Sequence, residues 1–427
     1  PAELAYFAAR PPPAVVALGG FWLQGAYLEA RDLLPGWWGV WAVLLFLVAY
    51  GALAPVPTPH RWLRPALVVV AAVGLLLAAG PGLGVTEPLF RLAWDHLPPY
   101  RAFRDSHKFA ALLALAYAYC GGLGVHALAA ELRPKAAWRQ VRRAALAGAF
   151  LLPPLTALPM VGWWGQLQPV HYPPDWYTVR SLLARDQDDA LVLVLPWHMY
   201  ADYPWLPNRW RRLANPAPAF FGPRVIAPDN LQIGVTESNS ADPVSRYVEA
   251  VLRRAEETQS LGALLAPLGV RYVLLLQTAT PRSHDFLWHQ EDLEVVFQGE
   301  TVTLFRSTRA TPRVYAVSGQ ARAGSLDEAL DAPPEALTRT LVLVGDGGPP
   351  PPVADASPPP RLEQAVAESP VAYRFAGAQG DYLVLALPQG AARQGWTLEG
   401  RRGPLHLGTL PAFPLEGTQG AVVFAPF

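Results

Sequence analysis

The stretch FAALLALAYAYCGGLGVHALAA, residues 109–130, contains no Asp, Glu, Lys or Arg. A helix of this length is long enough to cross the ~30 Å hydrocarbon core of a membrane. Three other stretches lack the same four residue types: Trp37–Ala54, Ala66–Gly84 and Ala144–Trp164. One Arg or Asp at the centre of such a helix would cost roughly 2.5–3.5 kcal/mol on insertion. We therefore predict an α-helical transmembrane region of about four helices over residues 37–165.

The loops between these stretches differ in charge, and this predicts their side of the membrane. Ala54–Pro65 carries Arg61 and Arg64 without an acid, and bases also dominate Glu131–Arg143. Both loops are expected in the cytoplasm, because cytoplasmic loops are enriched in Lys and Arg. The mixed loop Val85–Lys108 is then expected outside, and so is everything from residue 166 onward. The protein is thus predicted to be a multi-pass membrane protein with an extracytoplasmic C-terminal region.

Residues 1–36 are expected to form an outer-face segment. Ala14–Leu28 is short for a span and is interrupted by Gly and Gln, which favours an interfacial or re-entrant helix. A fifth span is the alternative.

Composition excludes several function classes. The chain has 427 residues with 34 basic and 34 acidic side chains, so its net charge gives no indication of nucleic-acid binding. Its one cysteine, Cys120, excludes an intramolecular disulfide framework and a cysteine-based metal site. The nine histidines lack zinc-site spacing, so no metal site is predicted. No cofactor is assigned, and a divalent cation stays an open alternative.

Beyond residue 166 the pattern changes to short strands and helices, which predicts an extracytoplasmic α/β domain over 166–318. Buried strands are expected at Ala190–Leu195 and Val270–Leu275, with a helix over Asp242–Arg254 between them. Residues 319–362 are expected to form an extension and a Pro-rich linker. Short apolar runs separated by Gly/Pro turns predict a small β-sandwich over 363–427.

Several segments, taken in order, resemble bacterial YfhO-like membrane proteins. TPRVYAV (311–317) with LDEAL (326–330) resembles one motif of that family, and LGVRYVL (268–274) resembles a second. DYLVL (381–385) with Gly395-Trp396 resembles a third, and PPYRAFR (98–104) with Lys108-Phe109 resembles a motif that opens a transmembrane helix. The resemblance extends to GT-C type glycosyltransferases, which are polytopic enzymes that use polyprenyl-phosphate sugars.

This resemblance implies transfer of a sugar from a polyprenyl-phosphate donor to a cell-envelope glycan or lipid acceptor, on the outer face of the bacterial inner membrane. GT-C enzymes have more helices than the four predicted here, and their catalytic Asp or Glu lies in the first outer loop. The chain therefore resembles a C-terminal portion, with the catalytic acid expected upstream of Pro1. The alternative is a non-catalytic membrane scaffold whose outer module binds carbohydrate or protein.

The first candidate site is the basic group that precedes the third apolar stretch. Arg101, Arg104, His107 and Lys108 are expected to bind the donor phosphate, because phosphate oxygens favour Arg and Lys donors and a helix N-terminus. The alternative is simple anchoring to lipid headgroups. Asp95 and Asp105 could act as acids or bases, but pairing with neighbouring arginines is the favoured explanation and needs no catalytic role.

The second candidate site follows the strand Ala190–Leu195. Loops at the carboxyl ends of strands often carry ligand sites, and aromatic rings stack on sugars. The residues expected to bind the acceptor sugar are Trp197, His198, Tyr200, Asp202 and Trp205. The alternative is a loop that packs on the membrane-proximal surface through its aromatic side chains.

Overall fold

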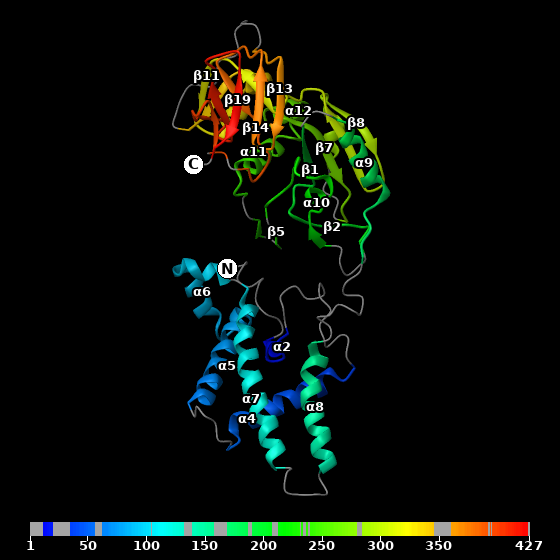
Figure 1. Cartoon of the computed structure of the whole chain (residues 1–427), viewed down its shortest axis with the longest axis vertical. Helices are drawn as coiled ribbons and strands as arrows, with labels where there is room; N and C mark the ends of the chain where they lie inside the picture. The colour runs from blue at the N-terminus through cyan, green and yellow to red at the C-terminus, as the bar shows by residue number, and fades with distance from the viewer. Residues whose placement is uncertain are drawn as a thin grey trace. The chain divides into compact units, whose positions relative to one another are not determined.

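The computed structural model describes residues 12–19, 35–55, 62–103, 105–131, 139–157, 169–186, 190–206, 212–230, 232–233, 236–237, 240–279, 284–345, 360–391, 393 and 395–425. The chain divides into two units (Figure 1). The helical unit comprises Pro1–Val170 with Gly234–Thr236, and the β-rich unit comprises His171–Ile233 with Glu237–Phe427. Each unit is described by itself.

The helical unit is built around one long helix, α7, which packs against both α4 and α5. Its described elements are α2 (Pro12–Val16), α4 (Trp37–Leu53), α5 (Leu63–Ala79), the 3₁₀ turn η1 (Gly80–Gly82), α6 (Glu87–His96), the 3₁₀ turns η2 (Pro98–Phe103) and η3 (Ser106–Phe109), α7 (Ala110–Glu131) and α8 (Arg139–Ala157). Glycines let α4 and α7 approach closely. A Cβ atom at Gly124 would overlap the Leu47 carbonyl oxygen, and one at Gly51 would overlap the Cys120 carbonyl oxygen.

Helices occur at all four positions predicted to span the membrane, but the described residues establish fewer than four spans. Leu63–Gly82 and Ser106–Glu131, of 20 and 26 residues, are long and apolar enough to cross a membrane. α4 is apolar but has 17 residues. α8 is described as far as Ala157, so the end of the predicted fourth span lies outside the described residues.

The apolar side chains of these helices are largely exposed. Leu53 of α4 is 84% exposed, Val69 of α5 is 62% exposed and Leu115 of α7 is 57% exposed. In a helix packed inside a water-soluble core, such side chains would be covered by neighbouring elements. The helical unit therefore presents apolar surface around its periphery.

The described part of the predicted segment Ala14–Leu28 is short and buried. α2 ends at Val16, and Val15 is fully buried against Ala78 of α5 and Ala110 of α7. Residues 20–28 lie outside the described residues, so an interfacial or re-entrant helix there stays a prediction.

The first layer of the β-rich unit is a five-stranded sheet with the order β4-β1-β7-β9-β8. Its strands are β1 (Leu191–Leu195), β4 (Val225–Ile226), β7 (Val270–Leu276), β8 (Leu293–Gln298) and β9 (Val302–Ser307). β1 pairs in parallel with β4 and β7, while β8 and β9 form an antiparallel hairpin. Two short two-stranded sheets lie outside this sheet: β2 (Tyr200–Asp202) with β3 (Arg212–Ala214), and β5 (Gln232–Ile233) with β6 (Thr236–Glu237).

Helices cover both faces of this sheet, which explains the continuous apolar run of β1. Leu191, Leu193 and Leu195 face α11 (Pro243–Leu252) and α12 (Leu261–Leu265). The alternate residues Val192 and Val194 face α9 (Pro174–Arg185) and α10 (Ala217–Phe221). Because side chains alternate along a strand, a strand covered on both faces is apolar at every position. The short turns of this layer are η6 (Ala266–Leu268) and η7 (Asp285–His289).

The second layer of the β-rich unit is a sandwich of two sheets. Its six-stranded sheet has the order β10-β15-β18-β17-β12-β11, and its four-stranded sheet has the order β13-β14-β19-β16. The strands are β10 (Val314–Val317), β11 (Gln320–Ala323), β12 (Leu341–Val344), β13 (Gln364–Ser369), β14 (Ala372–Ala376), β15 (Tyr382–Leu385), β16 (Trp396–Leu398), β17 (Leu405–His406), β18 (Leu410–Pro414) and β19 (Gln419–Phe424), with α13 (Leu326–Leu330) and η8 (Pro334–Thr338) between β11 and β12.

The sandwich is larger than the segment 363–427 that the sequence predicted. β10 pairs with β15, and β12 pairs with β17, so strands from 314–344 belong to the same sheet as the C-terminal strands. Residues 346–359, which belong to the predicted Pro-rich linker, lie outside the described part of the chain.

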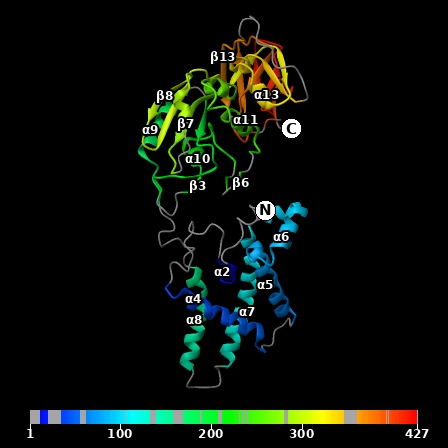
Figure 2. The same ribbon diagram turned by 180° about the vertical axis from the view of Figure 1, so that it is seen from behind.

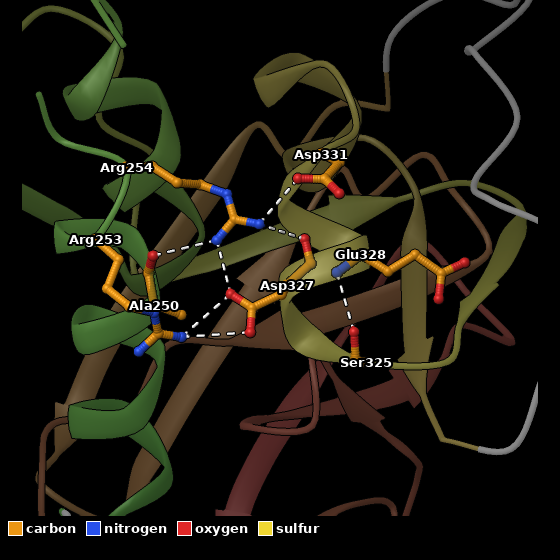
Figure 3. A network of polar contacts seen from close by, with 7 residues as sticks. All are labelled: Ala250, Arg253, Arg254, Ser325, Asp327, Glu328 and Asp331. Atoms are coloured by element: carbon orange, nitrogen blue, oxygen red, sulfur yellow. Dashed lines mark hydrogen bonds and ion pairs between the residues drawn. The ribbon is translucent and has the colours of Figure 1, made fainter. Parts of the chain in front are cut away.

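A polar network joins the sandwich to the α/β layer (Figure 3). Arg254, after α11, bonds Asp327 Oδ1 at 2.7 Å, the Asp327 carbonyl oxygen at 2.7 Å and Asp331 Oδ1 at 2.9 Å. Arg253 donates to both carboxylate oxygens of Asp327. These hydrogen bonds lower the pKa of Asp327. A second junction joins Asp242 to Arg393, 2.9 Å apart and mostly buried.

Candidate functional site

The turn that opens α7 places four polar residues at the start of a long apolar helix. In chain order they are Asp105, Ser106, His107 and Lys108, and η3 holds the last three. Ser106 is 1% exposed, and neither its hydroxyl nor the Oδ1 atom of Asp105 has a hydrogen-bond partner. Such buried orphan atoms are rare in folded proteins and call for an explanation, such as a ligand or water.

Neighbouring segments pack closely around this turn. The Nε2 atom of His107 lies 3.3 Å from the Leu18 carbonyl oxygen, which ties η3 to the segment after α2. Gly80, at the end of α5, has a φ of 53°, and a Cβ atom there would lie 2.8 Å from the Ser106 Cβ. Ser106 is therefore enclosed between the end of α5 and the start of α7, with no room for a side chain at position 80.

One exposed cationic group lies at this turn. Lys108 is exposed, and no described residue forms an ion pair with its ammonium group. The Asp105 carboxylate lies in the same turn, and the Ala110 amide at the start of α7 already donates to the His107 and Lys108 carbonyl oxygens. The Lys108 ammonium group is therefore the donor that this turn offers to a phosphate group.

The structure describes only part of the predicted donor set. His107 and Lys108 lie together in η3. The backbone of Arg101 lies in η2, which precedes η3, but its side chain is outside the described structure. Arg104 also lies outside the described residues. The convergence of all four bases stays a prediction.

The second candidate site lies at the carboxyl edge of the parallel strands β4, β1 and β7, where three loops meet. The Met199 amide, after β1, donates to the Asn230 carbonyl oxygen, after β4, at 3.3 Å. The Asn215 amide donates to the Met199 carbonyl oxygen at 2.8 Å. After β7, the Ala279 amide donates to the Asp202 carbonyl oxygen at 2.6 Å. Ligands of α/β sheets commonly bind at this edge.

The predicted sugar-binding residues divide into two groups at this edge. Trp197 is 9% exposed and its Nε1 atom lies 3.3 Å from Glu249 Oε1, so it packs into the core. Trp205 lies within an aromatic cluster, with its ring centroid 5.7 Å from that of Trp176. Tyr200 is 38% exposed, and Asp202 is half-buried in the same strand, β2. Only the second group presents polar side chains at the surface.

Two further polar residues lie at this edge, besides the five predicted sugar-binding residues. Asn230 is 3% exposed, and Asp229 has a buried Oδ1 atom without a hydrogen-bond partner. They follow β4, a strand of two residues, Val225–Ile226. A strand of two residues is too short to show a periodic sequence pattern. The sequence indicated this loop only through the polar pair Asp-Asn directly after Val-Ile-Ala-Pro. His198 is half-buried beside them in the loop after β1.

The motif residues within the β-rich unit hold its two layers in place. The Tyr315 hydroxyl donates to the Pro267 carbonyl oxygen of the first layer at 3.1 Å. Within the sandwich, the Arg313 Nε atom donates to the Ala386 carbonyl oxygen at 3.1 Å. Gly269 has a φ of 69°, and a Cβ atom there would lie 3.3 Å from the Ala386 Cβ. Burial raises the pKa of Tyr315 far above its usual range, so it stays neutral. These motifs therefore support the fold.

No metal centre is evident in the described part of the chain. Among those residues, no three His, Cys, Asp or Glu side chains are grouped so that they could hold an ion.

Comparison with known proteins gives one similar structure. No protein-family model matches the sequence. No curated protein matches it either. Among solved structures, the chain is similar to the cryo-EM structure of arabinofuranosyltransferase AftD from mycobacteria, at 15% sequence identity and a TM-score of 0.43. The alignment covers 100% of this chain and 40% of that one, so this chain spans well under half of that protein's length.

Proposed function

We propose that this chain is part of a membrane glycosyltransferase that transfers a sugar from a polyprenyl-phosphate donor to a glycan or lipid acceptor of the cell envelope. The observation that carries the proposal is the turn Ser106–Phe109 at the start of α7, with the exposed ammonium group of Lys108. The ordered motifs that resemble YfhO-like and GT-C proteins support the same reading.

The donor phosphate binds at this turn in the proposal. Lys108 supplies the point charge that pairs with the phosphate oxygens. Arg101 and Arg104 add further donors from the preceding segment, and His107 adds one from within the turn. The polyprenyl chain then lies along the exposed apolar side chains of the helical unit.

The acceptor binds at the carboxyl edge of β4, β1 and β7. Tyr200 offers a ring for stacking on a sugar, while Asp202, His198, Asp229 and Asn230 offer partners for hydroxyl groups. Trp197 and Trp205 hold the loop in place from within the core rather than contact the sugar. In the reaction a carboxylate takes the acceptor hydroxyl proton, the acceptor oxygen bonds to the anomeric carbon, and polyprenyl phosphate leaves. No residue of this chain is assigned as that carboxylate.

We place the β-rich unit outside the cytoplasm, where lipid-linked sugar donors of this class act. A non-catalytic scaffold with a glycan-binding module is the second candidate. It is favoured by the structural role of the motif residues Tyr315, Arg313 and Gly269. The two differ in turnover: a scaffold binds glycan but consumes no donor.

The test is sugar transfer by the full-length protein in nanodiscs, with a radiolabelled polyprenyl-phosphate sugar. Lys108→Ala should raise the KM for the donor about tenfold or more, since a hydrogen bond to a charged group contributes about 1.5–3 kcal/mol. Ser106→Ala should leave both KM and thermal stability unchanged, because the hydroxyl is enclosed and has no hydrogen-bond partner among the described residues. Arg139→Ala, which removes an exposed base at the start of α8, is the control and should leave KM unchanged. Unchanged KM in Lys108→Ala would exclude this turn as the donor site.

A further inference from the structure

α6 exposes an apolar face that no described residue covers. Leu89 is 59% exposed, Leu92 is 56% exposed, and Val85, just before the helix, is 95% exposed. The same helix buries Phe90, which is 3% exposed and whose ring centroid lies 6.1 Å from that of Tyr100. α6 therefore packs against the helical unit through Phe90, while Leu89 and Leu92 stay exposed.

Charged residues occupy the other side of α6. Arg91 pairs with Glu87 at 2.5 Å, one turn apart, and both side chains are about half exposed. At about 100° per residue, Arg91 lies about 200° around the helix from Leu89, which is nearly opposite. The exposed surface thus has a charged side and an apolar side, as in helices that lie in a membrane interface.

The neighbours of α6 are the ends of two apolar helices. It contacts η1, which ends the apolar helix 63–82, and η2, which leads to the apolar helix 106–131 (Figures 1 and 2). With 10 residues α6 is about 15 Å long, too short to cross a ~30 Å hydrocarbon layer. A short helix that connects two membrane-crossing helices must lie where they emerge.

We propose that α6 is an interfacial helix whose partner is the lipid bilayer itself, with Leu89 and Leu92 among the acyl chains and the Glu87–Arg91 pair toward water. In this position α6 would fix the following turn, with Lys108, at headgroup depth. The inference depends on the membrane placement of α5 and α7 but not on sugar transfer.

The experiment places a fluorescent probe on each side of α6. Leu89→Cys and Arg91→Cys are made separately in a Cys120→Ala background, labelled with an environment-sensitive dye, and reconstituted in nanodiscs of phosphatidylethanolamine and phosphatidylglycerol. Both positions are about half exposed, so neither label should disturb packing. Quenching is measured with acyl-chain doxyl lipids and with aqueous iodide.

The proposal predicts blue-shifted emission and doxyl quenching at position 89, with iodide quenching at position 91. Equal iodide quenching at both positions, without doxyl quenching at 89, would overturn it. Shielding of position 89 in native membranes but not in pure-lipid nanodiscs would also overturn it, because a protein partner would then cover the face. Neither result would bear on donor turnover, which the Lys108→Ala assay measures separately.

Discussion

At the scale of single residues, two buried polar groups stabilise the β-rich unit. His406 is fully buried, accepts a hydrogen bond from the Val342 amide at 3.0 Å, and bonds the Leu337 carbonyl oxygen at 2.9 Å. Asp292 is 5% exposed and accepts from the Gly262 and Ala263 amides at 3.0 and 2.7 Å. Both side chains satisfy backbone groups that water cannot reach. The local sequence does not predict these hydrogen bonds, because the backbone groups that His406 and Asp292 bond are distant in the chain.

His406 should make stability depend on pH. Burial lowers its pKa to about 4, against the opposing effect of the Leu337 hydrogen bond, while the unfolded chain has a pKa of about 6.5. Between these values the unfolded state binds the proton and the folded state does not. The free energy of unfolding should therefore fall by about 3 kcal/mol as pH drops from about 6.5 to about 4. Thermal unfolding across this range should show a flatter profile for His406→Asn than for the wild type. Identical slopes would refute the assignment.

Asp292→Ala should destabilise the α/β layer by about 1–3 kcal/mol, since it leaves two buried amides at the start of α12 without an acceptor. Burial raises the pKa of Asp292, and those backbone amides oppose the rise. Glu291→Ala, at the exposed neighbouring position, should change stability by no more than about 0.5 kcal/mol. Urea unfolding of both variants makes the comparison, and equal effects would contradict the capping role.

At the scale of elements, much of the β-rich unit could be predicted because its strands and helices carry strong periodic patterns. The runs at β1, β7 and α11 were identified within a residue or two. β2, β3, β4 and β17 were not, because strands of two or three residues depend on pairing with distant segments.

The candidate site residues differ in the same way. The basic turn before α7 and the loop after β1 are each contiguous in sequence, so a local pattern was enough to propose them as sites. Asp229 lies at the candidate site only because β4 pairs with β1. No local sequence pattern predicts that pairing. The inward packing of Trp197 also could not be foreseen, because a tryptophan in a loop can equally serve as a sugar platform or as core.

Helix packing in the helical unit should depend on single glycines. Gly124→Leu places a side chain against the α4 backbone, which cannot retreat without separating the helices. We expect a loss of stability of about 1–3 kcal/mol or more. Gly122→Leu, on the same helix with no atom within 4 Å of its Cβ position, should have little effect. Thermal unfolding in nanodiscs measures both, and a stable Gly124→Leu variant would mean that α4 and α7 do not touch there.

At the scale of the whole molecule, the proposed topology places the β-rich unit outside the cytoplasm. It follows from the charge of the loops and from an even number of crossings, of which two are supported by described helices. The helical unit supplies exposed apolar surface, and the β-rich unit supplies a loop-lined sheet edge.

An impermeant maleimide tests this topology in intact cells, in a Cys120→Ala background. Ser181→Cys, at an exposed position of α9, should be labelled without lysis. Arg139→Cys, at the predicted cytoplasmic start of α8, should react only after permeabilisation. The reverse pattern would invert the topology and remove the basis for an outer-face donor.

The central claim is that the turn at the start of α7 holds the phosphate of a lipid-linked donor, and photo-crosslinking tests it most directly. A polyprenyl phosphate with a photoreactive group next to the phosphate is irradiated with the full-length protein in nanodiscs, and the modified peptides are mapped by mass spectrometry. We predict crosslinks within 105–113, reduced several-fold by Lys108→Ala and unchanged by Arg139→Ala. Crosslinks confined to other segments, or equal in all three proteins, would contradict the claim.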